Sequence, residues 1–189
     1  MGSEQGKRKF YNVSLIGFMG TGKTTVGRLV AARLHYGFID TDHLIEMRVG
    51  KSITKIFEEE GEARFREYEK AVVAELESFR KMVIATGGGL GANSENLESL
   101  KKHSLVVCLW ASPETIYERI KKQTHRPLLQ TPEPLTKIRE LLALREPVYR
   151  QADVLISTDK RTTKEVAQQV IFHLRLARSR AAQIPKTNN

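Results

Sequence analysis

The residues with the most distinctive chemistry occupy positions 17–24, which read GFMGTGKT. They fit the phosphate-binding pattern G-x-x-x-x-G-K-[ST], with an apolar run at 13–16 before them and a helical pattern after them. Glycines let successive backbone N–H groups turn toward one anion, and a helix N-terminus adds free amides and a positive dipole end. A plain turn between a strand and a helix needs none of this, so the loop predicts binding of a nucleoside triphosphate.

Two side chains of this loop are expected to act on the triphosphate directly. Lys23 is placed to reach the β- and γ-phosphates, and the Thr24 hydroxyl is placed to ligate Mg²⁺. The other residues of the predicted nucleotide site are Gly20, Thr21, Gly22 and Thr25.

Two carboxylates, Asp40 and Asp42, follow an apolar pair at 38–39 that we expect to end a strand. In extended backbone residues i and i+2 point the same way, so both should face the crevice that holds the γ-phosphate. We expect Asp40 to hold Mg²⁺, directly or through water, and Asp42 to take the proton from an attacking hydroxyl. N-capping of the next helix by Asp42 is an alternative that is compatible with this role.

Three consecutive glycines, Gly87, Gly88 and Gly89, follow the apolar run at 82–85. A flexible turn is the simpler interpretation. At the carboxyl end of a strand in a nucleotide-binding fold, however, such glycines favour close approach of backbone to a small substrate.

The arginines are less informative from spacing alone. Arg66 lies four residues after Glu62 and three before Glu69, so a helical ion pair is a sufficient explanation for it. Arg145 is equally compatible with a surface position.

A lid is predicted at about 122–134, where the sequence has three prolines and no apolar periodicity from residue 123 onward. An irregular stretch of this length is more often a lid than a passive connector. Arg126 lies within it, and a mobile cation that closes over phosphates is what phosphoryl transfer uses.

The elements that must position these residues alternate along the chain. Near-continuous apolar runs are typical of parallel strands covered on both faces, so we predict an α/β fold with phosphates bound at the carboxyl ends of the strands. A helical insert at about 42–80 carries an apolar stripe that we interpret as packing and not as a cofactor site. The predicted strands are 13–16, 38–39, 82–85, 105–109 and 154–156.

Composition limits the alternatives. At 189 residues with 40% hydrophobic content, the chain is long enough for one packed domain, expected at 12–177. The net charge of +9 divides into +2 from residues 1–9, +1 from 10–159 and +6 from 160–189. We therefore expect a disordered arm (1–11) and a basic polar tail (178–189), not a specific nucleic-acid site.

The apolar run at 105–111 is too short to span a bilayer, and no apolar stretch follows the basic residues 7–9 as a signal peptide requires. The single cysteine, Cys108, is expected to be a small buried hydrophobe. With no disulfide possible within the chain, we expect a reducing, cytoplasmic location. We also expect a monomer without membrane contact.

Together, the motifs resemble the shikimate kinase family over residues 12–175. That resemblance implies transfer of the ATP γ-phosphate to the 3-hydroxyl of shikimate, in the biosynthetic route to chorismate and aromatic amino acids. It also implies a nucleoside-monophosphate-kinase-like sheet of five parallel strands with a shikimate-binding insert and a lid. The motifs are GFMGTGKT at 17–24, DTD at 40–42, FR at 65–66 with Glu69, GGG at 87–89, RPLL at 126–129 and REPVY at 145–149.

Carried over by position, the resemblance implies that Asp42 contacts the shikimate hydroxyls and is the candidate base. Arg66 and Arg145 clasp the carboxylate, with Glu69 orienting Arg66. The glycines 87–89 lie against the substrate. Bidentate pairing of two guanidinium groups with a carboxylate explains selection of an acidic polyol.

For ATP, the resemblance implies that Arg126 of the lid acts at the phosphates and that Arg119 flanks adenine. Asp42, Lys23 and Arg126 are then the expected catalytic residues. The loop at 158–163 lacks a proline that some family members place near adenine, which leaves the nucleobase preference open. A gluconate-type kinase and a nucleotide-binding regulatory module without turnover remain the alternatives.

Overall fold

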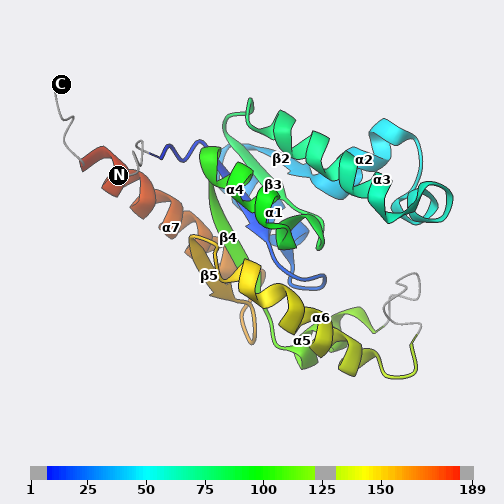
Figure 1. Cartoon of the computed structure of the whole chain (residues 1–189). Coiled ribbons are helices and arrows are strands. Elements are labelled where there is room, and N and C mark those ends of the chain that lie inside the picture. The colour runs from blue at the N-terminus through cyan, green and yellow to red at the C-terminus, as the bar shows by residue number, and fades with distance from the viewer. Residues whose placement is uncertain (1–7, 122–130, 184–189) are drawn as a thin grey trace, which may run out of the picture.

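The computed structural model describes residues 8–121 and 131–183 of the chain (Figure 1). Within these residues the strands are β1 (Asn12–Ile16), β2 (Gly37–Asp40), β3 (Met82–Ala85), β4 (Ser104–Trp110) and β5 (Val154–Ser157). The helices are α1 (Lys23–Leu34), α2 (Thr41–Val49), α3 (Ile53–Leu76), α4 (Ser94–His103), α5 (Pro113–Ile120), α6 (Pro134–Tyr149) and α7 (Thr163–Gln183), with a 3-10 turn η1 (Leu90–Ala92). None of these helices is both long and apolar enough to cross a membrane.

The five strands form one parallel sheet in the order β2-β3-β1-β4-β5. The predicted α/β class and parallel sheet are therefore confirmed. Most strands extend one residue beyond the apolar runs that predicted them, because polar residues join the ladder at its ends. Asn12, for example, pairs with Ser104, and Trp110 pairs with Ser157.

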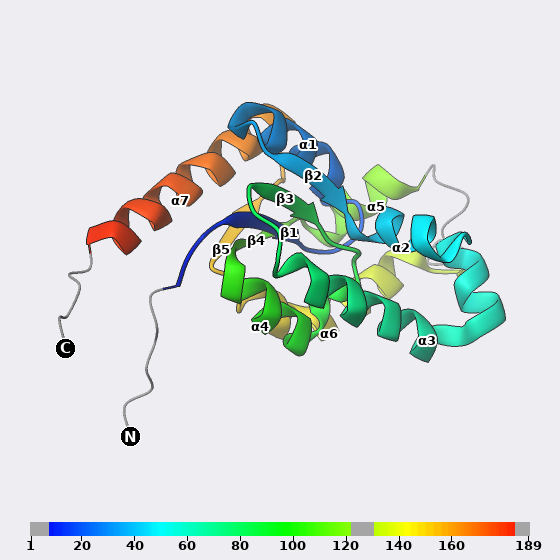
Figure 2. The ribbon, with the colours of Figure 1, turned by 90° about the horizontal axis from the view of Figure 1, so that it is seen from above.

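Helices cover both faces of the sheet (Figure 2). On one face α1 and α7 pack together over a core that includes Val13 and Leu15 of β1. On the other face α3, α4 and α6 lie over a core that includes Ile16, Val106 and Cys108. Cys108 is fully buried, as predicted. Because successive strand residues point to opposite faces, β1 and β4 contribute to both cores.

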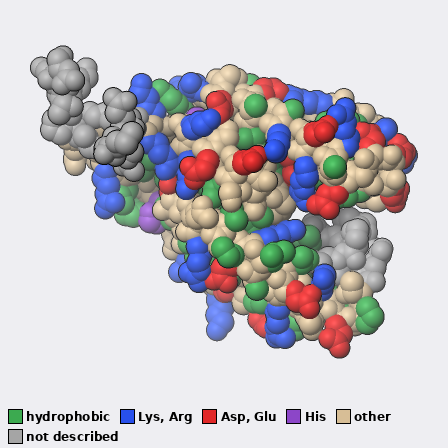
Figure 3. All heavy atoms as spheres, viewed as in Figure 1, with side chains coloured by type: hydrophobic (Ala, Val, Ile, Leu, Met, Phe, Trp, Pro, Cys, Tyr) green, Lys and Arg blue, Asp and Glu red, His purple; other side chains and the backbone are tan. Residues whose placement is uncertain are grey.

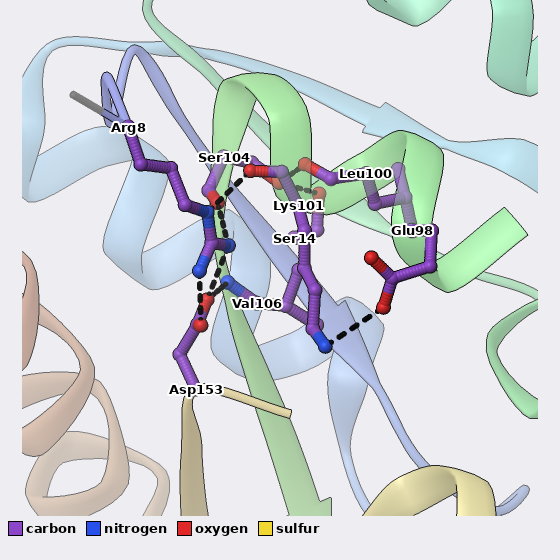
Figure 4. A network of polar contacts seen from close by, with 8 residues as sticks. All are labelled: Arg8, Ser14, Glu98, Leu100, Lys101, Ser104, Val106 and Asp153. Atoms are coloured by element: carbon purple, nitrogen blue, oxygen red, sulfur yellow. Dashed lines mark hydrogen bonds and ion pairs between the residues drawn. The ribbon is translucent and has the colours of Figure 1, made fainter. Parts of the chain in front are cut away.

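The N-terminal segment is bound across the amino end of the sheet (Figure 4). The Arg8 guanidinium pairs with the Asp153 carboxylate and donates a hydrogen bond to the Ser104 carbonyl oxygen at 2.9 Å. Asp153 also accepts the Val106 N–H at 2.8 Å. Residues 8–11, which the prediction of a disordered arm over 1–11 included, are thus held at the sheet edge, because the Arg8 guanidinium binds a carboxylate and a carbonyl there.

The end of α7 also differs from the expectation. The predicted tail starts at residue 178, whereas α7 continues to Gln183. The Arg178 guanidinium donates to the Phe10 carbonyl oxygen, at 2.9 Å from Nε and 2.7 Å from Nη2. Arg178, the first residue of the predicted tail, therefore ties the last helix to the N-terminal segment.

Two helix starts carry side-chain caps of a kind that the sequence shows. The Ser112 hydroxyl accepts the Thr115 N–H in front of α5, which begins with Pro113. Before α7, Glu165 accepts the Thr162 N–H at 2.7 Å while the Thr162 hydroxyl accepts the Glu165 N–H at 3.3 Å. Such reciprocal pairs satisfy backbone donors that the first helical turn leaves free.

The long helix α3 is bent at Gly61, which has φ 81° and ψ 171°. Residues with a side chain almost never adopt this conformation. The bend divides α3 into two helical halves, 53–60 and 62–76, that have different directions.

Replacing Gly61 with Asn is expected to lower the free energy of unfolding by about 2 kcal/mol, because Asn cannot relax at this φ and ψ. Gly50→Asn is the matched control, since Gly50 has φ 70° and ψ 18°, a left-handed conformation that Asn adopts readily. At both positions an added Cβ meets nothing within 4 Å. Equal losses in urea titrations of the two variants would contradict the assignment of strain to Gly61.

Candidate active site

A cavity of about 860 Å³ opens at the carboxyl ends of β1, β2 and β3. Its walls come from the loops after these strands and from α3, α5 and α6, so distant parts of the sequence meet there. Nearly all of the site residues predicted from the sequence line it: Gly20, Gly22, Lys23, Thr24, Thr25, Asp40, Asp42, Arg66, Gly87, Gly88, Gly89, Arg119 and Arg145. Arg126 and residues 122–130 of the predicted lid lie outside the described residues.

The phosphate loop has the backbone that its glycines predict. Gly20 and Gly22 have φ of 77° and 91°, and α1 begins at the next residue, Lys23. The Lys23 ammonium donates to the carbonyl oxygens of Gly17 and Phe18 at 2.8 and 2.9 Å. The Lys23 side chain is thereby held inside the loop, with its ammonium group close to the N-terminus of α1.

Thr21 is the predicted nucleotide-site residue that does not line the cavity. Its side chain is buried and its hydroxyl donates to the Phe18 carbonyl oxygen at 2.8 Å. Thr21 therefore stabilises the loop backbone by a buried hydrogen bond and does not face the cavity.

The predicted metal residues, Thr24 and Asp40, are hydrogen-bonded to each other. The Thr24 hydroxyl donates to Asp40 Oδ2 at 2.8 Å, which joins the start of α1 to the end of β2. A hydroxyl and a carboxylate beside a phosphate loop are oxygen donors of the kind that Mg²⁺ binds.

Asp42 lines the cavity from the start of a helix and not, as predicted, from the end of a strand. Strand β2 ends at Asp40, which pairs with Ala85, and α2 begins at Thr41. Asp42 therefore lies in the first helical turn, and the expected alternation along a strand does not apply. The N-cap position of α2 is Asp40, whose side chain makes no capping hydrogen bond, so capping by Asp42 is also wrong.

The environment of Asp42 raises the pKa of its carboxyl from 3.8 to about 6. Burial is the largest cause, followed by the nearby charges of Asp40 and Glu69, while Lys23 acts in the opposite direction. Among the described residues no group donates a hydrogen bond to Asp42 Oδ1. A carboxyl with this pKa and a free oxygen suits proton transfer near neutral pH.

The three glycines after β3 provide space for functional side chains. A Cβ on Gly87 would overlap the Asp42 carboxylate, and one on Gly89 would overlap the Arg66 guanidinium. A Cβ on Gly88 would lie 3.7 Å from Arg145 Nη1. None of the three glycines has a positive φ, so close approach, and not backbone freedom, explains the run.

Arg66 bridges two carboxylates on its own helix. It donates to Glu69 Oε2 at 2.6 Å and to Glu62 Oε1 at 2.7 Å. Glu69 is 1% exposed whereas Glu62 is 66% exposed, so only the first pair is sheltered from water. Burial lowers the pKa of Arg66, but the hydrogen bonds to Glu69 and Glu62 raise it above its usual value.

Burial raises the pKa of Glu69, and Arg66 partly offsets that effect. The buried glutamate therefore depends on Arg66 for its charge, and it holds the guanidinium at the cavity wall. Glu62 on the outer side is screened by water and contributes little.

Arg145 enters from α6. Its Nη1 donates to the Gly88 carbonyl oxygen at 3.3 Å, and its guanidinium carbon lies 5.2 Å from the ring centroid of Phe18. Arg119 enters from α5, where it donates to Thr158 Oγ1 at 2.8 Å and to the Gly20 carbonyl oxygen at 3.2 Å. Both arginines thus touch loops of the site.

Sequence reasoning missed part of the cavity wall. Phe65 belongs to the apolar stripe of the helical insert, which predicts packing, and it is 5% exposed. It also lines the cavity and lies 4.8 Å from Phe57, centroid to centroid. Phe57 and Phe65 lie on different sides of the bend at Gly61, and no spacing rule relates them. The other lining residues that were not predicted are Met19, Ile53, Thr54, Glu58 and Thr86, whereas Glu69 was expected beside Arg66.

A parallel sheet with a phosphate loop after its central strand, β1, and carboxylates after its edge strand, β2, defines a P-loop kinase. The family model for shikimate kinase matches residues 19–175. Shikimate kinase from Caldanaerobacter subterraneus is 49% identical over 160 residues, which cover 85% of this chain and 94% of that protein. The protein of the same name from Thermodesulfovibrio yellowstonii is 47% identical over 85% of this chain and 92% of its own length. The chain belongs to the shikimate kinase family.

Solved structures agree with this assignment. Shikimate kinase from Acinetobacter baumannii in complex with shikimate is 42% identical and has a TM-score of 0.82, covering 89% of this chain and 94% of that one. A gluconokinase from Sinorhizobium meliloti has a TM-score of 0.61 at 21% identity, over 94% of this chain and all of that chain, which shows the shared fold alone.

The raised pKa of Asp42 makes a prediction about stability. Since the folded pKa of about 6 exceeds the model-compound value of 3.8, the ionised carboxyl destabilises the fold above pH 6 and has no such effect below pH 4. Asp42→Asn is therefore expected to raise the free energy of unfolding by about 2 kcal/mol at pH 8 and to leave it nearly unchanged at pH 4.

Urea titrations at both pH values test this expectation. Glu118→Gln is the matched control, because Glu118 is a 61% exposed carboxylate on α5, and it should change stability by less than about 0.5 kcal/mol at either pH. A pH-independent effect of Asp42→Asn would contradict the assigned cause.

Proposed function

We propose that this chain transfers the γ-phosphoryl group of ATP to the 3-hydroxyl of shikimate, producing shikimate 3-phosphate and ADP. One observation carries the proposal: guanidinium groups from two separate helices, Arg66 and Arg145, line the same cavity as the phosphate loop and Asp42. A site for phosphate and a site for an acid thus adjoin a candidate base.

The acceptor is proposed to bind through its carboxylate. Arg66 and Arg145 each present a planar fork that matches a carboxylate in bidentate geometry. Glu69 holds Arg66 from the buried side, which leaves the edge now paired with exposed Glu62 as the one that an acceptor carboxylate takes over. The glycines 87–89 form the adjoining wall.

We assign Asp42 as the base that accepts the proton of the acceptor hydroxyl. As the 3-hydroxyl oxygen bonds to the γ-phosphorus, its O–H bond breaks and the proton passes to the Asp42 carboxylate. The bond between the γ-phosphorus and the β,γ-bridging oxygen breaks, and ADP leaves. The raised pKa supports this role, because a base with a pKa near the working pH transfers protons most effectively.

The donor is proposed to lie along the loop at 17–24, with Lys23 at the β- and γ-phosphates and Arg119 beside the base. Arg126 is assigned to the lid, which excludes water and so prevents wasteful ATP hydrolysis. Positioning and charge stabilisation account for most of the acceleration in phosphoryl transfer.

Mg²⁺ is the proposed cofactor, held by Thr24 and Asp40. Their contacting oxygens lie 2.8 Å apart at the phosphate loop, and a hydroxyl with a carboxylate fits the oxygen-rich coordination of this ion. When bound, the ion supplies positive charge to the phosphate oxygens.

We further propose that the protein acts as a cytoplasmic monomer, without specific binding to membranes or nucleic acid. In support, acidic and basic side chains are intermixed over α2–α3 and α5–α6 on the face in Figure 3. A surface of this kind presents no continuous basic stripe to a polyanion.

The alternatives make different use of the same cavity. A gluconate-type kinase would also bind an acid-bearing polyol, and a regulatory module would bind the nucleotide without turnover. The partly buried Asp42 and the two arginines on the cavity wall favour transfer to an acid-bearing acceptor such as shikimate.

A coupled ADP-release assay over shikimate, gluconate and nucleoside monophosphates tests the proposal. ADP release is expected with shikimate and not with the others, and a preference for gluconate would overturn it. Asp42→Asn is the control within the same assay: turnover should be abolished while ATP affinity changes little. Unchanged turnover would exclude Asp42 as the proton acceptor.

Arg145→Ala is expected to raise the KM for shikimate at least tenfold and to leave the KM for ATP within about twofold, since a charge-assisted bidentate contact is worth about 2 kcal/mol. The matched control is Arg139→Ala, because Arg139 lies on the same helix and pairs with Glu114 at an exposed position. Equal effects of Arg145→Ala on both KM values would contradict a carboxylate clasp.

A further inference from the structure

The backbone at Gly87 and Gly88 lies between the two helices that carry the acceptor-binding side chains. On one side is α2, with Asp42 in its first turn, and on the other is α6, with Arg145 in its last turns. Gly87 lies so close to the Asp42 carboxylate that a Cβ would overlap it, and the Gly88 carbonyl oxygen accepts a hydrogen bond from Arg145. Any shift of this peptide segment therefore changes both contacts at once.

On the α2 side, the segment is held by Thr41. The Gly87 N–H donates to the Thr41 hydroxyl oxygen at 2.9 Å, and Thr41 is fully buried. Thr41 directly precedes Asp42 in the chain. A buried backbone N–H that loses its acceptor is costly, so this hydroxyl fixes where Gly87 lies relative to the Asp42 carboxylate.

On the α6 side, the segment is held by Tyr149. The Tyr149 hydroxyl donates to the Gly88 carbonyl oxygen at 3.0 Å, and the ring is fully buried. Tyr149 lies one helical turn after Arg145, whose Nη1 donates to the same oxygen. Burial raises the pKa of Tyr149 to about 12, so its hydroxyl keeps the proton that it donates.

We propose that the hydroxyls of Thr41 and Tyr149 are positioning groups that clamp the Gly87–Gly88 segment and so set the distance between Asp42 and Arg145. Each hydroxyl is hydrogen-bonded to the Gly87–Gly88 segment, so we expect the clamp to act mainly on the acceptor site. This inference rests on the proposed function for its kinetic readout, but the clamp itself is a property of the backbone that is measurable without substrate.

The kinetic test compares Thr41→Val, which keeps the shape and removes the hydroxyl, with Thr41→Ser, which keeps the hydroxyl. Thr41→Val and Tyr149→Phe are each expected to raise the KM for shikimate by about tenfold while the KM for ATP stays within twofold. Thr41→Ser is expected to retain the wild-type KM. A shikimate KM that is unchanged in both Thr41→Val and Tyr149→Phe would overturn the proposal.

Ser14→Ala is the matched control. The Ser14 and Ser104 hydroxyls lie 2.8 Å apart, both residues are fully buried, and Figure 4 places Ser14 near the Arg8 network at the opposite end of the sheet. Ser14→Ala therefore also removes a buried hydroxyl, but it should change neither KM. A raised KM for shikimate in this control would show that the raised KM of the clamp variants comes from a general loss of stability.

Hydrogen exchange followed by mass spectrometry provides a readout without substrate. The peptide that spans residues 86–90 is expected to exchange at least tenfold faster in Thr41→Val than in the wild-type or Ser14→Ala chain. Unchanged exchange would overturn the clamp even if shikimate is the acceptor. Conversely, faster exchange in a chain that does not phosphorylate shikimate would overturn the proposed function and leave the clamp intact.

Discussion

Asp42 and Glu69 are carboxylates that the fold largely shields from water. Both line a cavity that also contains the phosphate loop, which favours the binding of further negative charge. Burying an anion is costly unless cations or hydrogen bonds compensate it, so the positions of Lys23, Arg66 and Arg145 follow from this constraint. Where compensation is incomplete, as at Asp42, the pKa rises and the group becomes a base. At Glu69 the pKa is also raised, but Arg66 offsets part of the cost of burial, and their 2.6 Å ion pair holds the guanidinium in place for binding.

The sheet makes this charge arrangement possible. In a parallel sheet all carboxyl ends lie at one edge, so the loops after β1, β2 and β3 meet although Lys23 and Gly89 are 66 positions apart in the sequence. The glycines at 87–89 let Asp42 and Arg66 approach the backbone of a third loop. The bend at Gly61 then lets both halves of α3 contribute to the same wall.

The strands, the helix caps and the phosphate loop could be predicted because each depends on residues close in sequence. Strand alternation failed at Asp42, since α2 begins at Thr41, directly after β2, where extended backbone through Asp42 was expected. The sequence analysis also did not predict that Arg8 binds at the sheet edge or that α7 continues to Gln183. Arg8 binds Asp153 and Arg178 binds the Phe10 carbonyl, and such partners, far apart in the chain, leave no local pattern.

By itself, the sequence determined a P-loop α/β fold, because glycine positions, apolar periodicity and capping residues act through local backbone energetics. It also held the side chains needed for an acid-bearing acceptor, but it left Arg66 and Arg145 equally explicable as surface residues. Only the tertiary structure decided that both line one cavity with Asp42. The physical reason is that the direction of a guanidinium depends on how α3 and α6 pack on the sheet, and packing is set by contacts between residues that are distant in the chain.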